Sequence, residues 1–247
     1  MNPIMFTSPA TTEQTKPVIV ALDFDNAEDS IRFASRLNPQ LCQLKIGKEL
    51  FTASGRSLAE TLINKGFRLF LDLKYHDIPN TVAKACKVAA QMGVWMVDLH
   101  TLGGSRMMHA AREAIEPFSN RPLLIGVTIL TSMEQSDLLE LGINKTPEKM
   151  VLDLASLAQK SGLDGVVCSA QEASVLKEQL GQNFVLVTPG IRLDLNTQDD
   201  QRRIMTPKEA LQAGAHYLVM GRPITQASDP VAVLKEINML QKGGNNL

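Results

Sequence analysis

The sequence predicts an α/β fold in which one domain forms a (β/α)8, or TIM, barrel. Three observations support this prediction. The chain has 247 residues, and such a barrel typically needs about 250. Short apolar runs alternate with longer helical segments, and no low-complexity tract or Ser/Gly-rich linker divides them. Charged residues gather where the apolar runs end, which is the end of a barrel that carries active sites.

The predicted strands are apolar runs that are far shorter than the ~20 residues of a membrane helix. They are 18–22, 41–46, 67–73, 94–99, 123–130, 165–168, 184–187 and 216–220. Both faces of a barrel strand are covered, by helices outside and by other strands inside, so such strands are expected to be apolar almost throughout.

The predicted helices lie between these strands and after the last one. They are 26–37, 48–65, 79–92, 104–116, 147–161, 170–180, 206–213 and 229–241. Asp25 or Asn26 can cap the first helix, and Thr146 and Thr206 are caps followed by a proline in the first turn. Glycines stand where helices are expected to stop before the next strand, at Gly66, Gly93, Gly162, Gly181 and Gly214.

An open doubly wound sheet is the alternative arrangement of the same elements. It usually carries a glycine-rich fingerprint after the first strand, and 21–28 (ALDFDNAE) contains no glycine. We therefore expect a barrel over 18–241, preceded by a flexible leader over 1–17 and followed by a tail over 242–247.

Composition excludes several classes of protein. A hydrophobic content of 44% excludes global disorder, and a net charge of −1 provides no bulk positive field for nucleic acid or anionic lipid. The 3 cysteines are widely spaced without a C-x-x-C pair, which argues against a disulfide scaffold or a zinc site. No signal-peptide pattern opens the chain. We expect a cytoplasmic protein with no nucleic-acid, membrane or metal partner.

Charges interrupt the apolar pattern at the carboxyl ends of the first four strands. The first ends in Asp23, the second in Lys45, the third carries Asp72 and ends in Lys74, and the fourth carries Asp98. Successive side chains of a strand point to opposite faces, and the charges of the first three strands share the parity of the inward residues. These four side chains, from Asp23 to Lys74, are therefore expected to converge over one mouth of the barrel.

This cluster of charges has two interpretations. A buried salt-bridge network can merely fix strand register, but four inward charges at one rim favour a functional site. A lysine between two carboxylates, here Lys74 between Asp72 and Asp77, stays protonated. It then suits a general acid better than a Schiff-base nucleophile, which needs a neutral amine. His76 can act as a base or be an ordinary loop histidine.

A second candidate region follows the last two strands. Segments 189–192 (PGIR) and 219–223 (VMGRP) lie where barrels often bind phosphate through backbone N–H groups. Gly221 permits close approach of the backbone, and Arg222 offers a bidentate donor. The polar loop 190–205 has the length of a lid or of an ordinary surface loop, and Gln201 could reach a phosphate from it.

At these residues the sequence resembles the orotidine 5′-phosphate decarboxylase family, from about residue 20 to about 237. The segments that carry the resemblance are 20–24, 44–51, 70–81 (FLDLKYHDIPNT), 127–133, 162–172, 186–192, 200–207 and 221–225. The D-x-K-x-x-D pattern followed by Asn-Thr is the most specific of them.

The resemblance implies a homodimeric barrel that decarboxylates orotidine 5′-phosphate to UMP and CO2, without a cofactor, in the last step of pyrimidine nucleotide synthesis. It implies Lys74 as proton donor, with Asp72, Lys45 and Asp77 of the other subunit around it. The substrate-binding residues that it implies are Asp23, Lys45, Asp72, Thr81 (also from the partner), Thr131, Arg192, Gln201, Gly221 and Arg222. Two alternatives stay open at this point: a sugar-phosphate aldolase or synthase on a related barrel, and a non-catalytic barrel that binds a phosphate ligand.

Overall fold

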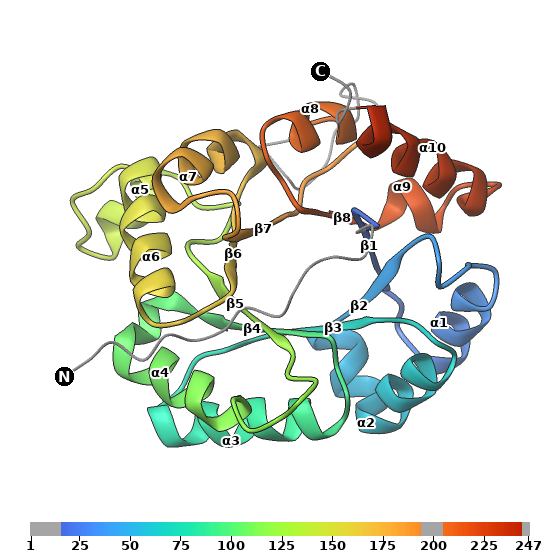
Figure 1. Cartoon of the computed structure of the whole chain (residues 1–247), viewed down its shortest axis with the longest axis horizontal. Helices are drawn as coiled ribbons and strands as arrows, with labels where there is room; N and C mark the ends of the chain where they lie inside the picture. The colour runs from blue at the N-terminus through green and yellow to red at the C-terminus, as the bar shows by residue number, and fades with distance from the viewer. Residues whose placement is uncertain (1–15, 194–204, 244–247) are drawn as a thin grey trace.

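The computed structural model describes residues 16–193 and 205–243. Eight parallel strands pair in the order of the sequence, and β8 closes the ring against β1. Figure 1 looks into this ring, with the strands around the centre and the helices outside them. The strands are β1 (Val18–Ala21), β2 (Gln43–Gly47), β3 (Leu69–Tyr75), β4 (Met96–His100), β5 (Leu123–Val127), β6 (Gly165–Val167), β7 (Val185–Thr188) and β8 (Tyr217–Met220). The predicted barrel is confirmed, and the open doubly wound sheet is wrong.

The helices follow the strands, as predicted. They are α1 (Ala27–Ala34), α2 (Lys48–Asn64), α3 (Pro79–Gln91), α4 (Gly104–Ile115), α5 (Gln135–Glu140), α6 (Pro147–Lys160), α7 (Ala173–Leu180), α8 (Pro207–Gln212), α9 (Arg222–Thr225) and α10 (Pro230–Gly243). Short 3-10 turns, η1 (Thr101–Gly103) and η2 (Ala170–Glu172), precede α4 and α7. The sequence did not predict α5 or α9, which are too short to show helical periodicity.

The predicted capping residues act locally as expected. The side chains of Asn26, Thr146 and Thr206 each accept a backbone N–H of the first turn, and Thr206 forms a reciprocal capping box with Glu209. Gly214 follows α8 with φ 103°, a conformation that a side chain disfavours. A Cβ there would also lie 2.7 Å from Cγ of Lys177.

The core has two layers that follow the alternation of each strand. Ile19, Phe70 and Met96 belong to a compact cluster inside the barrel. Leu69 and Leu71 belong to the larger cluster between the strands and the helices. Parity therefore places inward and outward residues of β3 as predicted, up to Leu71.

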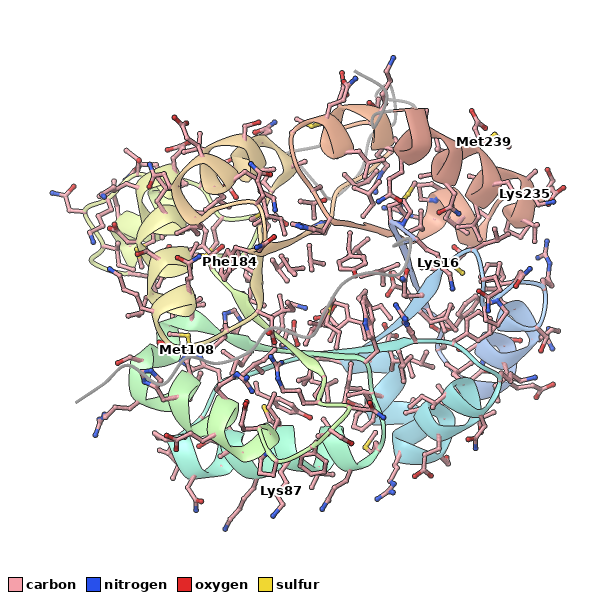
Figure 2. The ribbon with its side chains drawn as sticks, in the orientation of Figure 1. Lys16, Lys87, Met108, Phe184, Lys235 and Met239 are labelled. Carbon is pink, nitrogen blue, oxygen red and sulfur yellow. The ribbon has the colours of Figure 1, made fainter. Side chains whose placement is uncertain are left out.

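The helices turn their polar side chains to the periphery. Lys87 on α3 and Lys235 on α10 point away from the barrel (Figure 2), and both are exposed. Within the described residues, no helix is long and apolar enough to cross a membrane. Of the predicted leader, only residues 16 and 17 are described, and both contact the barrel. Lys16 donates to the carbonyl of Pro39, and the carbonyl of Pro17 accepts from Leu218.

Candidate active site

A cavity of about 340 Å³ opens at the carboxyl ends of the strands. Its volume lies in the range of about 300–1,000 Å³ that is typical of small-molecule sites. The polar residues that line it are Asp23, Lys45, Asp72, Lys74, Thr131, Arg192 and Arg222, together with the backbone of Gly190 and Gly221. Ile129, Leu130 and Pro189 add apolar walls. Sequence reasoning assigned no role to Ile129 and Leu130, because an apolar residue at a strand end looks like core.

Four charged side chains converge on one side of this cavity, and strand parity accounts for three of them: Asp23, Lys45 and Asp72. Lys45 Nζ lies 3.2 Å from Asp72 Oδ2 and 3.6 Å from Asp23 Oδ1. Lys74 Nζ donates to Asp72 Oδ1, so one carboxylate bridges two ammonium groups. The side chains of Lys45 and Asp72 are almost buried, whereas that of Asp23 is 69% exposed. The cluster thus offers cations and carboxylates to a ligand in the cavity.

The electrostatics of the cluster keep both inner groups ionised. Burial opposes the charge of Lys45, but Asp72 and Asp23 outweigh it and raise the pKa of Lys45. Burial likewise opposes the charge of Asp72, but Lys45 and Lys74 outweigh it and lower the pKa of Asp72 to about 2. The mouth therefore carries fixed charges at neutral pH.

Lys74 departs from the regular alternation that the sequence predicted. Its φ is 51°, and among the described residues it is the one non-glycine residue with a positive φ. The pairing of β3 with β4 shifts between Leu71, opposite Val97, and Tyr75, opposite Leu99. The extra residues form a bulge, and Lys74 lies in it. Parity alone therefore does not place Lys74; a local bulge turns it into the cavity.

Asp98 lies opposite this bulge and is the site residue whose role the sequence analysis missed. It is 0% exposed, and its Oδ1 accepts the backbone N–H of Lys74 at 2.8 Å. The sequence feature that could have indicated this role is the presence of a carboxylate inside the apolar run 94–99.

The rest of the cavity wall is formed by the ends of β5, β7 and β8. Arg192, Gly221 and Arg222 lie there, and Thr131 lines the wall after β5. A Cβ at position 221 would lie 3.3 Å from Asp23 Oδ2, so the end of β8 and the end of β1 approach closely. Gln201 and most of the predicted lid lie outside the described residues.

Two predicted site residues are not brought to this cavity by their own chain. Asp77 and Thr81 are exposed and are absent from its described lining. Asp77 Oδ1 accepts the N–H of Ile78 at 2.6 Å. His76 is also exposed, and its ring lies 5.5 Å from that of His100. No group of three or more His, Cys, Asp or Glu side chains within the described ranges is arranged to hold a metal ion.

Comparison with known proteins shows which family the chain belongs to. Residues 16–237 match the model of the orotidine 5′-phosphate decarboxylase / HUMPS family. Over 239 residues the chain is 69% identical to an orotidine 5′-phosphate decarboxylase of Neisseria meningitidis serogroup A, covering 96% of this chain and 97% of the relative. It is 62% identical to that of Chromobacterium violaceum over 96% of both chains. The crystal structure of the Lactobacillus acidophilus decarboxylase superposes with a TM-score of 0.82 at 40% identity, covering 92% of this chain and 99% of that one.

Proposed function

The chain belongs to the orotidine 5′-phosphate decarboxylase / HUMPS family, and we propose how its residues perform the reaction of the decarboxylases it resembles. It decarboxylates orotidine 5′-phosphate to UMP and CO2, the last step of pyrimidine nucleotide synthesis. The proposal is that Lys74 stabilises the carbanion formed at C6 of the pyrimidine and then protonates it. The observation that carries the proposal is the Lys45–Asp72–Lys74 chain of ionic contacts at the cavity wall.

The chemistry of the reaction calls for a fixed cation. Loss of CO2 from C6 leaves an electron pair in the plane of the ring, where the ring π-system cannot delocalise it. An ammonium group held beside C6 stabilises this pair and supplies the proton that completes UMP. Lys74 is suited to both roles because Asp72 orients its ammonium group and Lys45 neutralises part of the charge on Asp72.

The position of Asp72 adds a second effect in this proposal. Its carboxylate lines the same cavity as Lys74, so the substrate carboxylate enters beside a like charge. Repulsion between the two anions is relieved when CO2 departs, which favours the transition state over the bound substrate.

The remainder of the nucleotide fits the other residues of the cavity in the proposal. Asp23 accepts hydrogen bonds from the ribose hydroxyls, and Thr131 contacts the pyrimidine. Arg192, Gly221 and Arg222 hold the phosphate, and Gln201 contributes to the same contact. The close approach of Gly221 to Asp23 supports this order, because a 5′-phosphate is attached directly to the ribose.

We further propose that the active site is completed by a second copy of the chain. Asp77 and Thr81 lie beyond the end of β3 and are exposed. A second cavity of about 230 Å³ borders Asp23, Lys45, Asp72 and Lys74 on the side of α2. The 77–81 segment of a partner subunit placed against this side would face Lys74 with Asp77 and the ribose with Thr81. The homodimer would then carry two shared sites.

The direct test of the mechanism is an absorbance assay with orotidine 5′-phosphate in the presence of EDTA. The pyrimidine absorbance should change at the uninhibited rate, and the product should be UMP. A Schiff-base mechanism would instead trap a covalent adduct on treatment with borohydride, and a metal-dependent mechanism would stop on chelation. Either result would refute the proposal that Lys74 acts as a protonated general acid.

We also propose that the enzyme works in the reducing cytoplasm. Cys42, Cys86 and Cys168 are all free thiols and all buried, which a reducing compartment maintains. Burial raises the pKa of both Cys42 and Cys86 to about 12, so neither is poised as a reactive thiolate.

A further inference from the structure

The structure points to Asp98 as a positioning residue that acts through Lys74. We propose that Asp98 is a neutral carboxylic acid which holds the Lys74 backbone in its left-handed conformation and donates a hydrogen bond to Asp72. This inference deepens the proposed function, because it rests on Lys74 as the proton donor. Asp98 does not line the cavity and would not touch the substrate.

The first argument is the geometry of the bulge. Leu71 lies opposite Val97, and Tyr75 lies opposite Leu99. Between these two pairs β3 has three residues, whereas β4 has one. Asp98 is the residue of β4 between those two partners. Its Oδ1 accepts the Lys74 N–H at 2.8 Å and so replaces the ladder hydrogen bond that the bulge removes.

The second argument is the cost of the conformation that Asp98 holds. A side-chain-bearing residue at φ 51° is disfavoured relative to ordinary strand backbone, because its Cβ crowds the neighbouring carbonyl oxygen. Such a conformation persists only where the surroundings impose it. Asp98 imposes it from a position with 0% exposure, where solvent cannot substitute for the carboxylate oxygen.

The third argument concerns the other oxygen. Oδ2 of Asp98 is buried and receives no hydrogen bond from any group of the described chain. The Asp98 carboxyl lies within hydrogen-bonding reach of the Asp72 carboxylate. Two ionised carboxylates in contact repel, whereas a protonated Oδ2 donates to Asp72 and satisfies both oxygens of Asp98.

Charge balance agrees with this assignment. Asp23, Lys45, Asp72 and Lys74 sum to zero when all are ionised. An ionised Asp98 would add a surplus negative charge behind a site that must receive an anionic nucleotide. Burial first, and then the charge of Asp72, raise the pKa of Asp98 well above its ordinary value.

The titratable groups that face Asp98 come from three elements. They are Lys45 on β2, Asp72, Lys74 and Tyr75 on β3, and Cys86 on α3. The two lysines favour an ionised Asp98, but both already contact Asp72. Burial raises the pKa of Tyr75 and of Cys86 to about 12, so neither carries charge at neutral pH.

The first arm of the test compares Asp98→Asn with Asp98→Leu. A neutral Asp and an Asn each present an acceptor oxygen beside a donor group, so Asp98→Asn should keep kcat and KM within about threefold of wild type. Asp98→Leu keeps the branched shape and the number of heavy atoms, although its methyl groups are larger, and loses both hydrogen bonds. It should lower kcat at least about tenfold with KM changed less than about threefold, because the misplaced cation acts in the transition state. Thr101→Val, which removes a buried hydrogen bond to Val127 at the same end of β4, is the matched control and should stay near wild type.

The second arm measures protonation and holds even if Asp98→Leu does not fold. Equilibrium unfolding in urea is followed for wild type and Asp98→Asn from pH 5 to 7, at one fixed protein concentration. An Asp that is neutral in the fold but ionised when unfolded makes the ratio of the two unfolding constants, wild type over Asp98→Asn, rise about tenfold per pH unit. A purely structural hydrogen bond with an ionised Asp98 leaves this ratio flat.

Three results would overturn the inference: a flat ratio, an Asp98→Asn variant as slow as Asp98→Leu, or an Asp98→Leu variant with normal kcat. Lys74→Ala measured in parallel separates this inference from the function it rests on. Normal turnover in Lys74→Ala would refute the proton-donor role, while the unfolding arm would still report the protonation of Asp98.

Discussion

Lys74 combines an unfavourable backbone conformation with the central chemical role that we propose. Its φ of 51° directs its ammonium group to Asp72 and the cavity, and Asp98 holds that backbone in place. Strain of this kind persists where neighbouring groups impose it and where it prepares a side chain for its task. The acid is thus in position before substrate arrives, and no reorganisation is needed at the moment of reaction.

Removal of the Lys74 ammonium group is expected to abolish turnover and spare binding. Lys74→Ala should lower kcat by about 10⁴-fold or more, since it removes both charge stabilisation and the proton donor. The affinity for UMP, measured by calorimetry, should change little because the phosphate and ribose contacts remain. A near-normal kcat in this variant would refute the assignment of Lys74.

The phosphate end offers a prediction that depends on the substrate. Arg222→Ala should lower kcat/KM for the nucleotide on the order of 10²-fold, because a charge-assisted contact is lost. The phosphate-free nucleoside should react at an almost unchanged rate, since it never makes that contact. A comparable loss on both substrates would place the role of Arg222 elsewhere in the site.

For individual residues, the sequence predicted which charged side chains lie together at the barrel mouth. It did not predict how the backbone places Lys74 among them. Parity along β1, β2 and β3 brings Asp23, Lys45 and Asp72 to one mouth, since these strands are regular. Lys74 lies in a bulge, and a bulge depends on the neighbouring strand. Asp98, which stabilises it, is distant along the chain, so no local pattern links the two.

A buried lysine, Lys177, connects one helix to two strands of the barrel. Helix α7 is tied to the start of β7 and β8 through Lys177, whose ammonium group donates to the carbonyls of Gln182 and Phe184. The same group lies 3.1 Å from Nε2 of His216, and Nδ1 of His216 accepts the Leu186 N–H. His216 must remain neutral to keep this arrangement.

This link predicts a loss of stability in mild acid. Burial first, and then Lys177, lower the pKa of His216 from 6.5 to about 4. The folded state therefore binds fewer protons than the unfolded state between these values, so its stability is full above pH 6.5 and falls toward pH 4. The loss from His216 alone should be about 3 kcal/mol by pH 4.

The measurement is urea unfolding between pH 4 and 7 for wild type and His216→Asn. The variant should show a shallower dependence on pH, although not a flat one, because burial also lowers the pKa of His100 to about 4. His109→Asn removes an exposed histidine and is the control. Parallel curves for wild type and His216→Asn would refute the prediction.

A close approach between β5 and the elements outside it predicts a steric effect. A Cβ at Gly126 would lie 2.5 Å from Cγ2 of Thr101 and 3.1 Å from Cδ2 of Leu163. Gly126→Ala should therefore lower the free energy of unfolding by about 1–3 kcal/mol. Thr101→Ser removes the clashing methyl group and keeps the hydroxyl that donates to Val127.

The double variant should accordingly recover part of the loss. A double-mutant cycle by thermal or urea unfolding should show coupling of about 1 kcal/mol between positions 126 and 101. Additive effects of the two substitutions would mean that the barrel relaxes around the new methyl group in some other way.

Element boundaries were predictable to the extent that local signals set them. Thr146 and Thr206 cap α6 and α8 as expected, since a cap acts within one turn. Helix α9, with only 4 residues, and the 6-residue α5 carry no periodicity that a sequence can reveal. The sequence gives no reason for a glycine at position 126 of an apolar strand. The reason is the close packing of Thr101, which leaves no space for a Cβ there.

The closed barrel is what unites residues that lie far apart in the chain. Strand order follows the sequence, so β8 returns beside β1 and brings Gly221 next to Asp23. The alternation of strands and helices predicted this closure together with the chain length and the absence of a glycine-rich fingerprint after the first strand. The same alternation could not reveal how copies of the chain meet, because a partner's contribution depends on exposed residues such as Asp77 and Thr81.

The proposed sharing of active sites makes a quantitative prediction for mixed dimers. If Lys74 and Asp77 of one site come from different subunits, neither Lys74→Ala nor Asp77→Ala homodimers contain a complete site. In a hybrid of the two, one site carries both substitutions and the other carries none. Random exchange of equal amounts makes about half the dimers hybrid, so activity should recover to about a quarter of wild type, as two-fold symmetry requires.

A second pair of variants is the matched control, because Asp72 and Lys74 contact each other within one chain. In a hybrid of Lys74→Ala with Asp72→Ala, each site carries one substitution, so mixing should restore nothing. Decarboxylation is measured before and after exchange, and native mass spectrometry confirms that hybrids have formed. If hybrids with Asp77→Ala form and the rate stays at the sum of the two parents, then Asp77 does not complete the site of its neighbour. Recovery in the Asp77 mixture but not in the Asp72 mixture requires that the two carboxylates beside Lys74 come from different chains.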